Sequence, residues 1–455
     1  MKSLVNSLEV PVSNRVPEIA TKRTQVRYMI IAMLFIVAML NNADRAILSI
    51  TGTEIQSSLG IDSITLGYLF ASFAWAYMLA QLPGGWLLDR FGSKRVYGVS
   101  IFLWSFFTLI QGFVPILGIG ASIVALFVLR IAVGVAEGPA YANNSRVVSS
   151  WFPSSERGTA SAIFVSGQYA AAVVFTPLMG WLTHAHGWPS AYIVMGVIGI
   201  VVAFGWMAWF HFPSRHPKVN QAEIDYIREG GGMVDMDSQP AQQRKAKGET
   251  IACLKQLLSN RMLLGMYIGQ YGITTIVYFF LTWFPIYLIK GLNMPIMNAG
   301  FVAAIPAVFG FLGGVLGGVF SDWLLRRGHS ITFSRKVVIV VGMMLSMSLV
   351  LCNWAGGNQT LVILFMTLAF FGKGLGSLGW AVVADTAPKE AAGMTGGLFN
   401  TFANIAGVTT PIVIGYLVQK TGSFEWALIF VAANALLTII SYLFIVGPIK
   451  RVELN

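Results

Sequence analysis

Long apolar segments recur along this chain and limit what it can fold into. A helix that crosses a lipid bilayer needs about 20 mostly apolar residues. Twelve windows meet this length, at residues 28–50, 64–88, 96–117, 120–149, 158–183, 190–212, 262–289, 297–325, 335–355, 360–385, 393–419 and 424–447. Only 11% of the residues are charged, against roughly 25% in an ordinary soluble domain. The sequence therefore predicts an all-α membrane protein with twelve transmembrane helices.

The positive charge of the chain follows the order of these windows. The formal net charge is +11, and most of the 30 Lys and Arg residues stand in alternate connecting segments. Cytoplasmic loops of membrane proteins carry such an excess of Lys and Arg. We therefore expect these segments and both termini to be cytoplasmic, which explains the charge better than nucleic-acid binding does. We expect no cleavable signal, because the basic leader runs into a first window that is too long for one.

One long polar stretch, residues 213–261, divides the windows into two sets of six. We therefore expect five parts. These are a cytoplasmic N-terminal segment (1–27), a six-helix bundle (28–212), a cytoplasmic interdomain loop (213–261), a second six-helix bundle (262–447) and a cytoplasmic tail (448–455). For the basic segment that follows the second window, one interpretation is that it only anchors the topology.

The two halves repeat similar motifs at similar places. The motif after the second window contains Gly85, Asp89, Arg90, Gly92, Lys94 and Arg95, and its counterpart after the eighth contains Gly318, Asp322 and Arg326. Thr176-Pro177 in the first half recurs as Thr410-Pro411 in the second. The two pairs are separated by nearly the same number of residues as Asp89 and Asp322. Duplication of one six-helix unit explains this repetition.

These motifs resemble the major facilitator superfamily, whose loop signature is Gly-x-x-x-Asp-Arg/Lys-x-Gly-x-Lys/Arg-Lys/Arg. The resemblance implies two pseudo-symmetric six-helix bundles that rock about a central site. Charged groups at the helix ends can pair across the two bundles in one conformation and separate in another. We therefore predict conformational gating by the six motif residues of the first half and by Asp322 and Arg326 of the second.

Four ionisable residues of the first half fall inside apolar windows. Such residues are rare at membrane depth, and they mark transport pathways or proton relays by default. Asp44 and Arg45 are adjacent, so they point about 100° apart on a helix and each needs its own partner. Arg130 and Glu137 are two turns apart and therefore share one face. Internal ion pairs that only fix helix packing, Arg130 with Glu137 or Asp44 with Arg45, are the alternative.

The chemistry of these side chains favours an anion carried together with protons. A guanidinium stays protonated and matches a carboxylate with two parallel hydrogen bonds, so Arg45 and Arg130 suit an anionic substrate. A low dielectric favours the neutral forms of Asp44 and Glu137, which can then exchange protons near neutral pH unless a cation holds them charged.

Other polar residues in the windows are candidates for the same cavity. Lys373 in the tenth window can reach this cavity from the second half. Alternatively, it can form a structural pair with another residue and not contact the substrate. The neutral residues suited to binding substrate hydroxyls are Tyr77, Gln168, Asn400 and Asn404. Each could equally form a hydrogen bond between helices instead. We expect neither a metal nor a cofactor, and no enzyme or ATP-driven pump, because the sequence shows no ligand set, nucleophile with its base, or phosphate-binding loop.

Six segments narrow the resemblance. Residues 41–46, 130–139 and 151–157 resemble the anion:cation symporters, and residues 81–95, 369–381 and 385–390 resemble their glucarate/galactarate branch. The resemblance implies a bacterial inner-membrane protein that imports a small sugar-acid anion with protons. It implies proton coupling at Asp44 and Glu137, anion binding at Arg45 and Arg130, and neutral substrate contacts at Tyr77, Gln168, Asn400 and Trp380. We expect a monomer surrounded by lipid.

Alternatives to a dicarboxylate symporter stay open at this point. Asn42 stands where the family usually has tyrosine, and two other family patterns differ at residues 137–142 and 165–168, so a monocarboxylate such as galactonate or a hexuronate, or another organic anion, is an alternative substrate. A receptor that senses a sugar acid is the alternative outside transport. Because an aldarate carries a carboxylate at each end, we predict that Lys373 binds the second one.

Overall fold

The structure is a computed structural model, and it describes residues 23–153, 156–236, 247–388 and 392–453. All regular structure in these ranges is helical, which confirms the all-α class. The first half contains α1 (Val26–Leu59), α2 (Ser63–Phe91), α3 (Ser93–Gln111), η1 (Val114–Leu117), α4 (Ile119–Glu137), α5 (Ala140–Trp151), α6 (Arg157–His186) and α7 (Trp188–Trp209). Between the halves lie η2 (Pro213–Arg215), α8 (Gln221–Glu229) and α9 (Lys247–Ser259).

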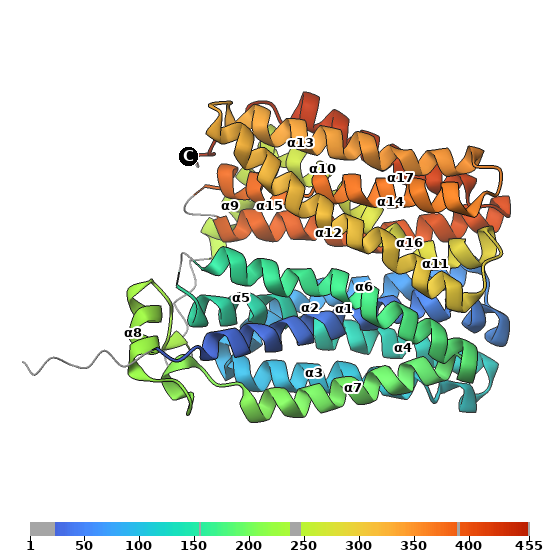
Figure 1. The fold of residues 1–455 in the computed structure, drawn as a ribbon, viewed down its shortest axis with the longest axis horizontal. Coiled ribbons are helices and arrows are strands. Elements are labelled where there is room, and N and C mark those ends of the chain that lie inside the picture. Colours follow the sequence, from blue (N-terminus) through green and yellow to red (C-terminus); the bar gives the residue numbers. More distant parts are fainter. Residues whose placement is uncertain (1–22, 154–155, 237–246, 389–391, 454–455) are drawn as a thin grey trace, which may run out of the picture.

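The second half repeats this plan with more interruptions. It contains α10 (Arg261–Tyr278), the π-helical turn η4 (Phe279–Trp283), α11 (Phe284–Ile286), the π-helical turn η5 (Tyr287–Gly291), α12 (Ile296–Arg326), α13 (Ile331–Ser346), η6 (Met347–Trp354), α14 (Gln359–Leu375), α15 (Gly379–Thr386), α16 (Ala392–Thr421), α17 (Glu425–Ile440) and η8 (Ser441–Ile445). The long helices run side by side along the longest axis of the molecule, with the first half forming one bundle and the second half the other (Figure 1). The bundles meet where α6 packs against α12 and α2 against α16.

The two ends of the molecule differ in what covers them. Helices α8 and α9 and the C-terminal residues lie at one end, which we call the basic end, and α11 lies at the opposite, far end (Figure 1). Eleven helical stretches of the described residues are long and apolar enough to cross a membrane. The remaining predicted window forms α3, a helix of 19 residues that packs along α4 and α7. The chain is therefore a multi-pass membrane protein.

Two predicted windows are each divided into two helices. The window at 120–149 becomes α4 and α5, which separate at Gly138 and Pro139. Proline lacks a backbone N–H and clashes with the preceding turn, so a helix readily breaks there. The window at 360–385 becomes α14 and α15, and the break follows the glycine-rich end of α14 at Gly376.

Part of the predicted interdomain loop is docked onto the first bundle. Glu223 of α8 is fully buried, and its Oε1 lies 3.2 Å from Nη1 of Arg27 at the start of α1. Arg27 Nε also lies 3.1 Å from Oε2 of Glu156, which accepts a hydrogen bond of 2.6 Å from the hydroxyl of Tyr226 through its other oxygen. These contacts fix α8 against α1, a long-range arrangement that the polar composition of the loop did not predict.

Paired glycines allow two helices of the second half to approach closely. A Cβ atom added to Gly342 of α13 would lie 2.5 Å from the carbonyl oxygen of Gly372 in α14, and a Cβ on Gly372 would lie 2.5 Å from the carbonyl oxygen of Gly342. Small residues let helix backbones approach in this way in membrane proteins. The spacing of α13 and α14 therefore depends on both glycines.

Gly342→Val is expected to lower the free energy of unfolding by about 1–3 kcal/mol, the usual cost of overpacking a filled contact. The measurement is thermal and denaturant unfolding of the purified protein in detergent. Gly397→Val is the matched control, because a Cβ on Gly397 meets no atom within 4 Å. Equal losses in the two variants would show that the close approach does not matter.

Candidate functional site

The four ionisable residues of the first half meet inside the bundle. Asp44 and Arg45 lie on α1, and Arg130 and Glu137 lie on α4. Asp44 and Arg130 are each 3% exposed and Glu137 is fully buried. The shared face predicted for Arg130 and Glu137 therefore points into the protein. We call these four residues the central cluster.

One ion pair organises the central cluster. Arg45 Nε donates a hydrogen bond of 3.0 Å to Oε2 of Glu137, and Arg45 Nη2 lies 3.0 Å from the same oxygen. Neither of the two pairs considered from the sequence, Arg130 with Glu137 or Asp44 with Arg45, is the ion pair that forms. The partner of Arg45 comes from another helix, because the adjacent Asp44 points to a different side of α1.

Two aromatic rings of α2 support the arginines. The guanidinium of Arg45 lies 4.5 Å from the ring centroid of Tyr77 and 5.1 Å from that of Phe73, and the guanidinium of Arg130 lies 5.0 Å from the Phe73 ring. The two rings are stacked, with centroids 5.8 Å apart. Aromatic faces attract cations electrostatically, and more strongly where both are desolvated. The rings therefore hold two cations at membrane depth and leave N–H groups available for a carboxylate.

Several buried polar atoms of the central region have no hydrogen-bond partner among the described residues. They include Arg130 Nε and Gln81 Nε2, whereas the carboxylates of Glu137 and Asp44 have Asn41 and Trp104 within hydrogen-bonding reach. Buried polar groups in proteins are nearly always paired, so a concentration of unpaired ones needs an explanation. These two unpaired atoms are N–H donors, which suit the oxygens of an anionic ligand.

The second half reaches this region through α10 and α16. Asn400 Nδ2 of α16 donates a hydrogen bond of 3.1 Å to Oε1 of Gln81 on α2, which joins the two halves. Asn404 Nδ2 instead bonds the carbonyl oxygen of Asn400, within its own helix. Tyr278, the last residue of α10, lies close enough to Arg45 to interact electrostatically. The sequence did not single out Tyr278, but a π-helical turn follows it directly, and such turns are frequent at functional sites.

A cavity lies between the halves, and Asn42 and Ala46 of α1, which flank Asp44 and Arg45 in sequence, help to line it. It has a volume of about 110 Å³, and its polar lining groups are Asn42 of α1, Gln168 and Tyr169 of α6, and Lys373 of α14. Lys373 is 7% exposed, and its Nζ lies 5.3 Å from the ring centroid of Phe370. No carboxylate of the described residues forms an ion pair with it. Lys373 is therefore a buried cation at the interface that the protein itself does not neutralise.

Trp380 lies apart from both groups. It is on α15, 56% exposed, and its ring packs edge-to-face against Phe399 with centroids 5.0 Å apart. Its predicted contact with substrate therefore stays a prediction. Among the residues that the structure covers, no group of three or more His, Cys, Asp and Glu could hold a metal ion.

The predicted gating residues lie at the basic end of both bundles. Gly85 and Arg90 belong to α2, Gly92 precedes α3, and Lys94 and Arg95 begin it, while the side chain of Asp89 lies outside the described residues. In the second half, Asp322 lies 3.3 Å from Arg335, within its own bundle. Arg326 ends α12 and is exposed. Gating by these residues stays a prediction.

Polar contacts between the halves occur at the far end. Lys290 Nζ donates a hydrogen bond of 2.6 Å to Gln56 Oε1, and the backbone N–H of Ser63 donates one of 3.2 Å to Gln419 Oε1. The backbones also approach there, because a Cβ on Gly67 would lie 2.7 Å from the carbonyl oxygen of Pro411. The two bundles are therefore held together at the far end.

Two bundles with buried charges at their interface define a membrane transporter, and comparison with known proteins agrees. The model of the Major Facilitator Superfamily matches residues 34–333 and 329–454. This chain belongs to that superfamily, and it is a transporter rather than an enzyme. Solved structures of an inward-facing bacterial homolog of the human lysosomal transporter Spinster and of the inward-open xylose transporter XylE from E. coli both superpose with a TM-score of 0.68. The Spinster homolog is 16% identical to this chain, and the alignment covers 93% of this chain and 95% of the homolog. XylE is 14% identical, and the alignment covers 94% of this chain and 97% of XylE.

Closer relatives are curated bacterial transporters. The probable galactarate/D-glucarate transporter GudP of Bacillus subtilis is 58% identical over 96% of this chain and 95% of its own length. Its counterpart in Escherichia coli K12 is 55% identical, over 95% of this chain and 96% of its own. The D-galactonate transporter of E. coli O6:H1 is 38% identical, over 96% and 99%.

A double-mutant cycle on the central ion pair is expected to show strong coupling. Arg45→Gln or Glu137→Gln alone leaves a buried charge without its partner, which costs about 3–5 kcal/mol. The double variant removes both charges, so its cost is expected to fall short of the sum of the two by about 1–3 kcal/mol. The measurement is the free energy of unfolding in detergent without substrate. The control cycle pairs Arg45→Gln with Glu229→Gln, at an exposed site on α8, and should be additive.

Proposed function

We propose that this chain is a proton-coupled symporter that imports a dicarboxylate sugar acid, galactarate or D-glucarate, by alternating access. The observation that carries the proposal is the contact between Arg45 and Glu137, in which a protein carboxylate occupies the arginine that suits a substrate carboxylate. Relatives named galactarate/D-glucarate transporters, at 58% and 55% identity, support the choice of substrate.

The ion pair supplies a physical basis for coupling to protons. A charged Glu137 competes with the substrate carboxylate for the N–H groups of Arg45. A protonated Glu137 loses its charge and binds the guanidinium far more weakly, so a proton on Glu137 frees Arg45 for substrate. Asp44, which lies within electrostatic reach of Arg130 and Glu137, is the second proton site that we propose. The proton is the coupling ion, and no cofactor is needed.

Charge suggests the orientation of the transporter, and contacts join its two halves. Lys and Arg residues gather at the basic end, so by the positive-inside rule that end and both termini face the cytoplasm of a bacterial inner membrane. Contacts such as that of Lys290 with Gln56 join the bundles at the far end, and the hydrogen bond of Asn400 with Gln81 joins them nearer the middle. One chain holds both halves of the site, so the monomer is the transporting unit.

Lys373 extends the proposal to both ends of the substrate. A six-carbon aldarate carries a second carboxylate that also needs a cation once it leaves water. Lys373 lies on the second half, in the cavity that Asn42 and Gln168 also line. With one carboxylate on the arginines of the first half and the other on Lys373, the substrate bridges the two bundles and favours their closure.

Glu137→Gln is expected to separate accumulation from exchange. Purified protein in liposomes should accumulate labelled glucarate under an inward proton gradient, and a protonophore should abolish this. In Glu137→Gln the gradient should no longer drive accumulation, because the proton site is gone, whereas exchange of labelled for unlabelled glucarate should continue.

The control for this variant is Glu229→Gln, an exposed glutamate far from the central cluster, which should accumulate glucarate like the wild type. Gradient-driven accumulation by Glu137→Gln would refute its role. Glucarate binding by the wild type without any flux would indicate a receptor, and flux of galactonate or a hexuronate alone would indicate a monocarboxylate substrate.

Lys373→Gln is expected to weaken uptake of dicarboxylates selectively. Loss of a hydrogen bond to a charged group costs about 1.5–3 kcal/mol, which corresponds to about 10-fold to 100-fold in apparent affinity for glucarate. Competition by galactonate, which has a single carboxylate, should change much less. Lys420→Gln, on the exposed end of α16, is the control. An equal loss for both substrates would rule out a two-ended site.

A further inference from the structure

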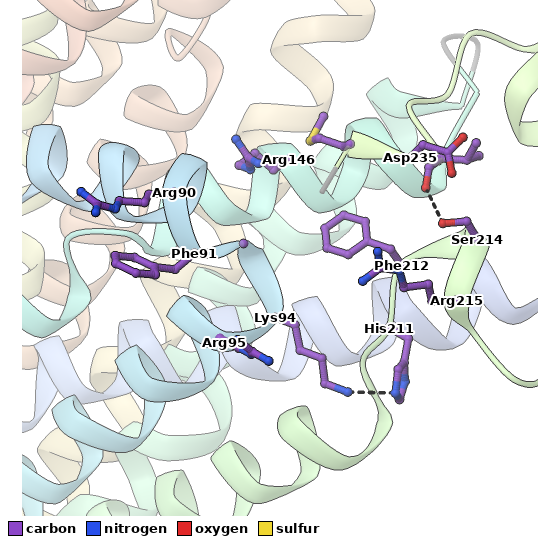
Figure 2. A pocket seen from close by; sticks show the side chains of 13 residues that line it. Arg90, Phe91, Lys94, Arg95, Arg146, His211, Phe212, Ser214, Arg215 and Asp235 are labelled. Carbon is purple, nitrogen blue, oxygen red and sulfur yellow. Dashed lines mark hydrogen bonds between the residues drawn. The ribbon is translucent and has the colours of Figure 1, made fainter. Parts of the chain in front are cut away.

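A strongly basic pocket lies at the basic end of the first bundle, away from the central cluster. Its volume is about 410 Å³, and the turn between α2 and α3 forms one wall while residues 211–215 form the other (Figure 2). Its ionisable lining residues are Arg90, Lys94, Arg95, Arg146, His211 and Arg215, with Asp235 as the only acid among the residues that line it. Asp235 itself lies 3.3 Å from Arg228, so it contributes little negative charge to the pocket.

The groups in this pocket produce a positive field. Lys94 and His211 point toward each other, with Nζ and Nε2 2.9 Å apart (Figure 2). The ring of His216 lies 5.8 Å from that of His211. Burial lowers the pKa of His216, and nearby positive groups, His211 first among them, lower it further. Concentrated charge of one sign in a concave site attracts a ligand of the opposite sign, and arginine forks match phosphate oxygens well.

An apolar groove continues from the pocket along the same two helices. It has a volume of about 300 Å³ and is lined by Gly98, Val99 and Phe102 of α3 and by Ala203, Phe204 and Met207 of α7. Residues at spacings of four and seven share a helix face, so Arg95 stands in line with Val99 and Phe102. On the other wall, Met207 precedes His211 by four residues. Along α3 the groove therefore begins about one helical turn from the basic pocket.

Exposed side chains show that the groove faces out of the bundle. Val99 is 53% exposed and Phe204 64%, and neither is covered by the second half. Near the pocket, Trp209 is 67% and Phe91 53% exposed. Aromatic residues gather at the level of the lipid headgroups in membrane proteins. The exposed Trp209 therefore favours a pocket at headgroup depth, with the groove nearer the acyl chains.

We propose that the pocket and groove together bind one anionic phospholipid. The phosphate lies among Lys94, Arg95 and the other basic side chains, and one acyl chain follows the groove between α3 and α7. Basic pockets on the cytoplasmic side of membrane helices suit such headgroups. A soluble phosphate would leave the groove empty. A headgroup that carries its own cation would be repelled by Arg90, Lys94 and Arg95 in the lining of the pocket. The bound lipid joins α3, α7 and the segment that leads to α8.

Native mass spectrometry of the full chain in detergent tests this proposal with two lipids of identical acyl chains, phosphatidylglycerol and phosphatidylcholine. The wild type is expected to retain phosphatidylglycerol at least about 10-fold more strongly, as several basic residues near one phosphate predict. Lys94→Gln/Arg95→Gln should lose this preference. Arg326→Gln/Arg327→Gln removes the same charge at the same end of the second half and should keep it.

Two further measurements distinguish a lipid phosphate from free inorganic phosphate as the ligand of the pocket. Val99→Trp fills the groove and leaves the charges in place, so it should weaken the binding of phosphatidylglycerol. Inorganic phosphate at the same concentration should not displace the lipid, and displacement would show a site for a soluble anion. Equal retention of the two lipids, or an equal loss in the two double variants, would overturn the proposal. Arg95→Gln alone replaces the double variant if that protein does not run as a single species in gel filtration.

Discussion

A buried guanidinium that must have a carboxylate is the constraint around which the first bundle is arranged. Arg45 is at membrane depth and always charged, so it needs a partner of opposite sign from another helix. Glu137 of α4 supplies it at 3.0 Å. That contact requires α4 to lie close to α1, and α2, whose Tyr77 ring lies against Arg45, packs along α4. Glycines permit this approach, since a Cβ on Gly134 would lie 2.6 Å from the carbonyl oxygen of Phe73 and one on Gly138 2.7 Å from that of Ala80.

The sequence could predict the members of the central cluster but not its pairing. Charged residues within apolar windows stand out, and the periodicity of a helix is enough to place Arg130 and Glu137 on one inward face. The choice of Glu137 by Arg45 depends on how α1 and α4 are rotated and spaced, which is a property of the packed bundle. The same limit applies to Tyr278, whose role comes from a position opposite Arg45 that no local pattern encodes.

The same distinction applies to the fold: features set by local sequence could be predicted, whereas contacts between distant residues could not. Hydropathy alone locates the membrane-spanning stretches, and Pro139 marks the break between α4 and α5. The docking of α8 could not be foreseen, because the partners Arg27 and Glu223 are 196 residues apart. Residues 213–261 look like a solvated linker in composition, yet the part described up to residue 236 is held against the first bundle by a fully buried carboxylate.

The two anion sites of the first bundle are built on opposite principles. In the central cluster two arginines face two acids, so the net charge is small, and in the proposed mechanism a single proton decides whether a cation is available to a ligand. In the basic pocket Arg and Lys side chains outnumber Asp235, the one acid among the described lining residues, so the pocket keeps a positive charge whether or not His211 is protonated. A transported anion must be released as well as bound, which requires the first design. A lipid that stays in place is served by the second, and Lys94 and Arg95 of the superfamily motif belong to that second site.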